Sequence, residues 1–378
     1  MDQDNKEPLL ESFQLGDLTL KNRIVMASLT RSRADNPESA PTDLNVLYYQ
    51  QRASAGLILT ESTWVSKNAI GFINLPGIYS EAQVAGWKKV TEAVHEKGGK
   101  IFIQIAHSGA VSHPDFFDGE LPLGPSTINP QEKTFTPKGF KDTVTPKAYT
   151  VPEIKATIEE YKKAAANAKL AGFDGVEIHA QIFTLIPQFL HPATNQRIDE
   201  YGGTIQNRAR IIFEIIDAVK TVYPDQRIGI KFTPAAYNMG LIKPIDSTLD
   251  TFTYIFKKLN DLNLAYIHLV GPDVDLTGTP LNDIATNYYG YFRKLYNGRI
   301  MVNRGFNKQS ANEIIKNGDA DLVSFGTYYI ANPDLVERFA ADIELAEADS
   351  STFYTSGEKG YTDYPTANEV ISNADNKV

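Results

Sequence analysis

Histidines are the side chains of this chain best suited to exchange a proton near neutral pH, and there are six of them. His179 stands at the end of an apolar run, whereas His268 lies inside another such run and is expected to pack there. His95, His113 and His191 are expected on helix or loop surfaces. No pair of histidines and carboxylates has the spacing of metal ligands on a helix, so no metal site is predicted. The absence of cysteine from the sequence excludes disulfides, thiolate metal sites and cysteine nucleophiles.

The composition favours one large domain spanning residues 1–378. Hydrophobic residues make up 42% of the 378 positions, which is ample for a single core. The formal net charge of -9 argues against nucleic acid or an anionic membrane as a partner. No apolar run approaches the roughly 18 residues of a membrane span, and residues 1–8 do not read as a signal peptide. We therefore expect a cytoplasmic protein.

Short apolar runs alternate with longer amphipathic stretches, which is the pattern of repeated βα units. Eight candidate strands cover residues 23–27, 56–61, 100–105, 175–179, 228–232, 266–270, 299–302 and 322–325. Helices are expected at residues 151–171, 205–222, 249–262 and 308–317. A count of eight fits a closed barrel better than an open sheet, so the pattern predicts a (β/α)₈ TIM barrel.

Three stretches depart from this alternation. Residues 108–147, after the third strand, are long and rich in Pro, Gly and Thr, and are expected to cap one end of the barrel. Residues 180–203 form a second long connection, after the fourth strand. Because loops after the strands build the active sites of this fold, both should border the site. Residues 366–378 are predicted to be a flexible tail.

Several phrases along the chain resemble the old yellow enzyme family in the same order. They are LTLKNRIVMASLTR at 18–31, PGIYS at 76–80, HPATNQR at 191–197, DEYGGTIQNR at 199–208 and GYTDYP at 360–365. The resemblance runs from about residue 8 to residue 367. It implies a barrel that holds FMN at its C-terminal mouth, is reduced by NAD(P)H, acts on a small-molecule substrate and exists as a monomer or homodimer.

The resemblance also implies which residues hold the flavin ring. It places Ala27 and Thr30 against the N5/O4 edge, and Gln104 at the pyrimidine ring. Lys231 stands beside N1 and O2, where the family usually has Arg. The lysine keeps a positive charge there but loses the planar fork of a guanidinium.

The phosphate of FMN would lie at the loops after strands seven and eight. These loops contain Asn303, Arg304 and Gly305, and then Gly326 and Thr327. Thr327 occupies the position of a phosphate-binding Arg in the family, and Arg304 a position that is often Gly. Either Arg304 partly replaces the missing charge, or it points to solvent and the affinity for FMN is reduced.

The implied substrate site departs most from the family. His179, the first of two donors to a substrate carbonyl, is retained, but Ile182 replaces the second donor. Thr184 replaces the Tyr that protonates the substrate's α-carbon, and it is too short to reach the same atom. Phe183 replaces a Gly and Ala106 a bulky aromatic residue, which makes the pocket more apolar.

Three functions remain open at this point. The first is an FMN oxidoreductase that acts on an apolar unsaturated small molecule and reduces ordinary enones weakly. The second is a redox-neutral isomerase, cyclase or cycloaddition catalyst in which FMN is absent or only structural. The third is a catalytically silent binding protein. A local bulge would make Gln181 the second donor instead of Ile182.

Overall fold

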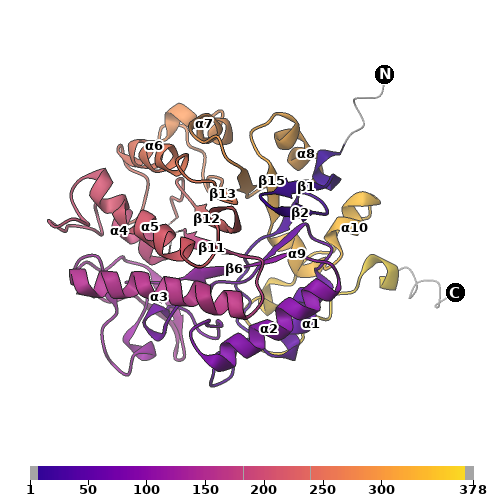
Figure 1. Ribbon diagram of the computed structural model, residues 1–378, viewed down its shortest axis with the longest axis horizontal. Coiled ribbons are helices and arrows are strands. Elements are labelled where there is room, and N and C mark those ends of the chain that lie inside the picture. Colours follow the sequence, from indigo (N-terminus) through magenta and orange to yellow (C-terminus); the bar gives the residue numbers. More distant parts are fainter. Residues whose placement is uncertain (1–6, 182, 239, 371–378) are drawn as a thin grey trace.

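Eight parallel strands close into a barrel in the computed structural model, which describes residues 7–181, 183–238 and 240–370 (Figure 1). In order around the barrel they are β3 (Ile24–Met26), β4 (Leu57–Leu59), β6 (Ile101–Ala106), β11 (Gly175–Ala180), β12 (Ile228–Phe232), β13 (Tyr266–Val270), β14 (Ile300–Asn303) and β15 (Leu322–Phe325). β15 pairs with β3 and β6 with β11, so the sheet has no gap. The predicted (β/α)₈ fold is confirmed.

Helices surround the barrel (Figure 1). They are α1 (Asp43–Gln51), α2 (Glu81–Glu96), α3 (Val151–Leu170), α4 (Leu185–Leu190), α5 (Ile205–Lys220), α6 (Thr248–Leu259), α7 (Tyr288–Leu295), α8 (Lys308–Lys316), α9 (Thr327–Ala331) and α10 (Leu335–Ala340). The four predicted helices correspond to α3, α5, α6 and α8 within three residues at each end. Thr150 and Glu153 start α3 as a capping box. None of the helices described is long and apolar enough to cross a membrane.

The N-terminal end of the barrel is filled by apolar side chains. An antiparallel hairpin of β1 (Phe13–Leu15) and β2 (Leu18–Leu20) closes this end. Its leucines pack with the inward-facing residues of the strands, among them Val25, Phe102 and Tyr266. A Cβ at Gly229 would lie 2.4 Å from the ring of Tyr266, so a glycine makes room for this packing. The open end of the barrel is therefore the opposite, C-terminal mouth.

The capping insertion after β6 covers the C-terminal mouth. It contains β7 (Leu123–Gly124), which pairs with β10 (Lys147–Ala148), and a hairpin of β8 (Lys133–Thr136) and β9 (Gly139–Asp142). The amide of Ile73, in the connection that follows β5 (Thr63–Trp64), donates to the carbonyl of Phe135 in this hairpin (2.9 Å). The insertion is thereby joined to the loop after β4.

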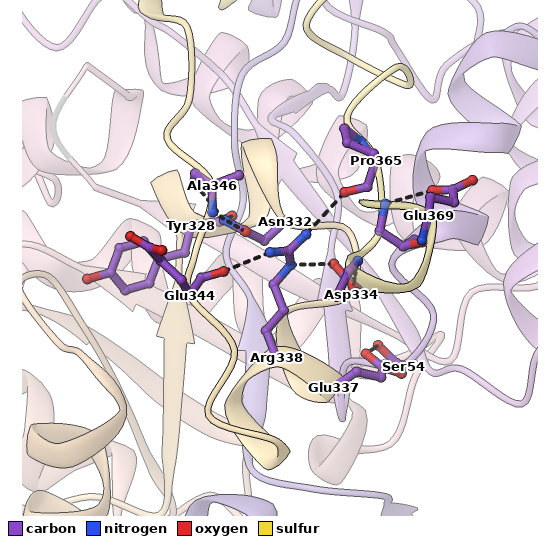
Figure 2. Close-up of polar contacts among 12 residues, drawn as sticks. Ser54, Tyr328, Asn332, Asp334, Glu337, Arg338, Glu344, Ala346, Pro365 and Glu369 are labelled. Atoms are coloured by element: carbon purple, nitrogen blue, oxygen red, sulfur yellow. Dashed lines mark hydrogen bonds and ion pairs between the residues drawn. The ribbon is translucent and has the colours of Figure 1, made fainter. Parts of the chain in front are cut away.

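The C-terminal segment is attached to α10. Arg338 donates to Asp334 (2.8 Å; Figure 2), and the amide of Ala367 donates to the same carboxylate (2.7 Å). Of the tail predicted to be flexible, residues 366–378, this contact fixes the beginning, while residues 371–378 lie outside the described part.

Candidate active site

A cavity of about 970 Å³ opens at the C-terminal mouth of the barrel. Its volume is at the upper end of the roughly 300–1,000 Å³ that small-molecule sites occupy. Seven of the residues singled out in the sequence line it: Thr30, Gln104, His179, Gln181, Phe183, Thr184 and Lys231. They come from the ends of β3, β6, β11 and β12 and from the turn before α4. The fold thus brings together side chains that are up to 201 positions apart, from Thr30 to Lys231.

The other predicted site residues lie elsewhere. Ala27, Ala106, Asn303, Arg304, Gly305, Gly326 and Thr327 are not among the residues that line this cavity. Ile182 lies outside the described residues, so its predicted place in the pocket stays a prediction. Several lining residues were missed by sequence reasoning, including Ser28, Ser62 and Tyr354. Ser62 follows directly after the second predicted strand, which was the one available indication.

A chain of buried polar side chains crosses the barrel beneath the cavity. Gln104 Nε2 donates to Glu177 Oε1 (2.7 Å), and His268 Nδ1 lies 2.8 Å from Glu177 Oε2. His268 Nε2 in turn lies 2.8 Å from Ser324 Oγ, and this hydroxyl oxygen accepts a hydrogen bond from Asn303 Nδ2 (2.9 Å). His268 was expected only to pack, but it links two strands by hydrogen bonds. The amide of Asn303 is committed to this chain and is not free for a phosphate.

Glu177 carries the negative charge of this row of hydrogen-bonded side chains. Burial raises the pKa of its carboxyl, but His268, the Lys231 cation and the Gln104 amide together outweigh burial and lower the pKa to about 2. Burial lowers the pKa of His268, so that the neutral ring donates Nδ1–H to the ionised carboxylate. The centre of these buried polar side chains is therefore a carboxylate surrounded by hydrogen-bond donors.

The acid dependence of stability follows from that pKa. A carboxyl whose pKa falls from 4.5 to about 2 on folding stabilises the folded state above its unfolded pKa. This stabilisation should be lost as the pH falls from about 4.5 through about 2. We expect the stability difference between wild type and Glu177→Gln, measured by urea unfolding, to shrink across this range. A difference that does not change with pH would show that Glu177 is not preferentially ionised in the fold.

Lys231 is a buried cation beside the cavity, with only 5% of its surface exposed. Burial lowers the pKa of its ammonium, and the nearby charge of Glu177 opposes that effect. In the described part of the chain it makes no hydrogen bond or ion pair. Burying an ammonium group that makes no such contact costs free energy, unless a ligand supplies a hydrogen-bond acceptor. This is the strongest sign that the cavity accepts a group with acceptor atoms.

His179 faces the cavity as a neutral ring. Burial lowers its pKa to about 3, and the positive charge of Lys231 acts in the same direction. Its Nδ1 lies 3.0 Å from the hydroxyl of Ser62. The ring can therefore take part in hydrogen bonds to a ligand but does not carry a charge near neutral pH.

The turn between β11 and α4 shapes the wall next to His179. The hydroxyl of Thr184 lies 2.5 Å from the carbonyl of Gln181 and 3.0 Å from that of His179, so it donates to the backbone. Phe183 has a left-handed backbone (φ 71°) and is 45% exposed. A left-handed φ favours glycine, the residue that the resemblance implies at this position. The turn thus places an aromatic ring at the cavity mouth.

The loop that carries Thr30 is held in place by hydrogen bonds to Glu61 and to the C-terminal segment. Glu61 Oε2 accepts from the backbone amides of Arg31 (3.1 Å) and Ser32 (3.3 Å). Arg31 also donates to the carbonyl of Gly360 (2.6 Å), the first residue of the GYTDYP motif. The motif therefore has a local physical role, since it anchors the loop that borders the cavity.

The predicted phosphate loops contain one uncommitted cation. Arg304 is exposed and has a left-handed backbone (φ 89°), and among the described residues it has no hydrogen bond or ion pair. Next to it, a Cβ at Gly305 would meet nothing within 4 Å, so the loop surface is open. Thr327, at the start of α9, is exposed.

These residues fit an FMN molecule. The pyrimidine end of a flavin needs hydrogen-bonding partners and a cation, which the second N–H of the Gln104 amide and the uncommitted Lys231 can supply. The phosphate end needs an open backbone and a positive charge, which the loop of Arg304 and Gly305 can supply. The positive charge would come from the loop after β14 in place of the loop after β15.

Comparison with known proteins identifies the family of this chain. The family model "NADH:flavin oxidoreductase / NADH oxidase family" matches residues 8–346. The flavin oxidoreductase hxnT of Emericella nidulans is 38% identical over 96% of this chain and 98% of its own length. 12-Oxophytodienoate reductase 1 of Oryza sativa subsp. japonica is also 38% identical, over 96% of this chain and 94% of its own.

Solved structures agree as well. Morphinone reductase is 41% identical, with a TM-score of 0.90 over 97% of this chain and 98% of its own. The old yellow enzyme homologue from Zymomonas mobilis is 35% identical, with a TM-score of 0.88 over 94% of this chain and 99% of its own. The chain therefore belongs to the NADH:flavin oxidoreductase / NADH oxidase family, that of the old yellow enzymes, which are FMN-dependent NAD(P)H oxidoreductases.

Proposed function

We propose that this protein is an FMN oxidoreductase, reduced by NAD(P)H, that acts on an apolar unsaturated small molecule and reduces ordinary enones only weakly. The observation that carries the proposal is the pairing of Lys231, whose ammonium makes no hydrogen bond to other described residues, with a neighbouring Thr184 whose hydroxyl donates to the backbone. Family membership favours this function over the redox-neutral and the silent binding alternatives.

Aromatic rings at the mouth support an apolar substrate. The ring of Phe72 lies 5.6 Å from that of Tyr354 and 6.4 Å from that of Phe140, and all three line the cavity. Phe140 belongs to the capping hairpin and is 63% exposed. Exposed rings around an opening provide an apolar contact surface at a small entropic cost. An extended apolar substrate would lie against them.

Weak enone reduction follows from the part of the cavity wall that contains Gln181, Phe183 and Thr184. When a hydride adds to an enone, the neighbouring carbon must receive a proton, and a positioned acid contributes roughly 10²–10⁴-fold to the rate. The hydroxyl of Thr184 is committed to two backbone carbonyls and is a poor acid. Proton delivery would then depend on solvent or on another tyrosine, such as Tyr354 in the cavity lining, which should slow this step.

The proposal is tested by the absorbance spectrum of the purified protein before and after the addition of FMN. We expect stoichiometric uptake of a yellow flavin that NADPH bleaches, followed by slow return of the colour with simple enones. A protein that takes up no FMN, or that converts a substrate without any reductant, would overturn the proposal.

Arg304→Ala tests the phosphate end. We propose that Arg304 supplies the charge missing at Thr327, so the substitution should weaken FMN binding about 10–100-fold, the cost of one charge-assisted contact. Ala at a left-handed position carries a strain like that of Arg, which makes it a matched replacement. Arg304→Lys should retain much of the affinity, and Thr327→Arg should increase it. If FMN titration gives the same Kd for Arg304→Ala as for wild type, Arg304 does not contact the phosphate.

A further inference from the structure

The orientation of the Gln104 amide is fixed by its neighbours. Its Nε2 lies 2.7 Å from Glu177, and a carboxylate only accepts hydrogen bonds, so the NH₂ group must face Glu177. Its Oε1 therefore faces the hydroxyls of Ser28 (2.7 Å) and Ser62 (2.9 Å). A carbonyl oxygen has no proton, so each of these contacts is a hydrogen bond only if the serine donates.

This orientation leaves Ser62 with one arrangement that satisfies both of its contacts. The hydroxyl has a single proton, and the contact with Gln104 Oε1 uses it. Its second contact, with His179 Nδ1 at 3.0 Å, is then a hydrogen bond only if Nδ1 carries a proton and donates. The reverse arrangement would leave two oxygens 2.9 Å apart with no proton between them.

From this geometry we infer that Ser62 is a positioning residue that holds His179 in its Nδ1–H tautomer, so that a bare Nε2 is presented to the ligand. The ring is neutral, since burial lowers its pKa to about 3, and one proton is all that it has to place. Gln181 also contacts the ring, where its hydrogen bond acts to raise the pKa of His179, but its amide has both a donor and an acceptor end and does not fix the tautomer.

This arrangement defines the chemical class of the ligand at His179. A bare ring nitrogen accepts a hydrogen bond, so it matches a hydroxyl or N–H group and not a carbonyl oxygen. We infer that the group of the ligand that meets His179 is a donor, a hydroxyl or an N–H. As a statement about the substrate, this inference rests on the proposed oxidoreductase function, whereas the tautomer itself does not.

The tautomer can be measured directly by long-range ¹H–¹⁵N correlation spectra of the protein labelled at histidine, as purified and again with FMN. His179→Gln assigns the signal. We expect a protonated Nδ1 and an unprotonated Nε2 in wild type and in Ser62→Thr, which keeps the hydroxyl. Ser62→Ala should shift the proton toward Nε2. A protonated Nε2 in wild type, or a Ser62→Ala spectrum identical to that of wild type, would overturn the inference.

Ligand binding gives a second readout. Cyclohex-2-en-1-ol and cyclohex-2-en-1-one share a carbon skeleton and differ in one group, a hydroxyl that can donate a hydrogen bond or a carbonyl that can only accept one. The ratio of their Kd values therefore isolates this contact. We expect the alcohol to bind about tenfold more tightly to wild type, and the preference to fall or reverse in Ser62→Ala. Tighter binding of the ketone to wild type would contradict the ligand class. A protein that takes up no FMN but shows Nδ1–H would refute the proposed function and leave the tautomer standing.

Discussion

Replacing Glu177 by leucine is expected to lower the free energy of unfolding by about 3–5 kcal/mol, the cost of removing one partner from a buried charged network. The substitution leaves the Lys231 cation buried without a nearby negative charge. It also leaves the Gln104 amide without its acceptor and His268 Nδ1–H without its partner. The side chain is completely buried, so water cannot replace the carboxylate at low cost.

Urea unfolding of a small set of variants measures this effect. Glu159→Leu is the matched control, because Glu159 lies on the surface of α3 with its side chain 68% exposed, and it should change stability by no more than about 0.5 kcal/mol. The double variant Glu177→Leu/Lys231→Met removes both charges and should recover part of the loss. If Glu177→Leu is as stable as wild type, the buried chain does not hold the barrel interior together.

Replacing Lys231 by methionine is expected to slow the reduction of bound FMN by NADPH about 100-fold, as happens when one preorganised electrostatic partner is removed from an active site. Reduction places negative charge on the flavin ring, and Lys231 is the cation that faces the cavity without a hydrogen bond or ion pair to other described residues. Methionine has a similar length and is well tolerated in buried positions. The change therefore removes the charge while filling the same space.

Rapid mixing of the FMN-loaded variants with NADPH under anaerobic conditions measures this rate. Lys231→Arg keeps the charge and restores the residue that is usual in the family, so it should reduce within a few-fold of wild type. An FMN titration of each variant separates weaker flavin binding from slower reduction. If Lys231→Met reduces as fast as wild type, its charge has no part in the reaction.

The barrel could be predicted because each strand is a short apolar run. The helices α1 and α2 were not predicted, although Ser80 and Gln83 form a capping box at the start of α2 and gave a usable indication. The hairpin of β1 and β2 was also missed. It depends on a turn in which Gly16 has a φ of 60° and where an added Cβ would lie 2.8 Å from Cβ of Gln226, a proximity across 210 positions that local pattern cannot show.

The site was predicted in part, and for a different reason. The family resemblance predicted that Gln104, His179 and Lys231 lie at the same mouth of the barrel. It did not show the row of hydrogen-bonded side chains that runs through Glu177 and His268. These hydrogen bonds depend on which side chains share a layer inside the closed barrel, and the register of the strands determines which side chains do. Residues 177 and 179 both point inward because they are two apart. The alternation was visible in the sequence, but the pairing of His268 with Glu177 was not.

The most direct test of the account separates the two half-reactions. FMN-loaded protein would first be reduced with NADPH and then mixed with cyclohex-2-en-1-one, with morphinone reductase measured alongside. The proposed function predicts reduction by NADPH, followed by reoxidation at least about 100-fold slower than in morphinone reductase, because the Thr184 hydroxyl donates to backbone carbonyls and is a poor acid. Reoxidation at the rate of morphinone reductase, or a flavin that NADPH does not reduce, would contradict it.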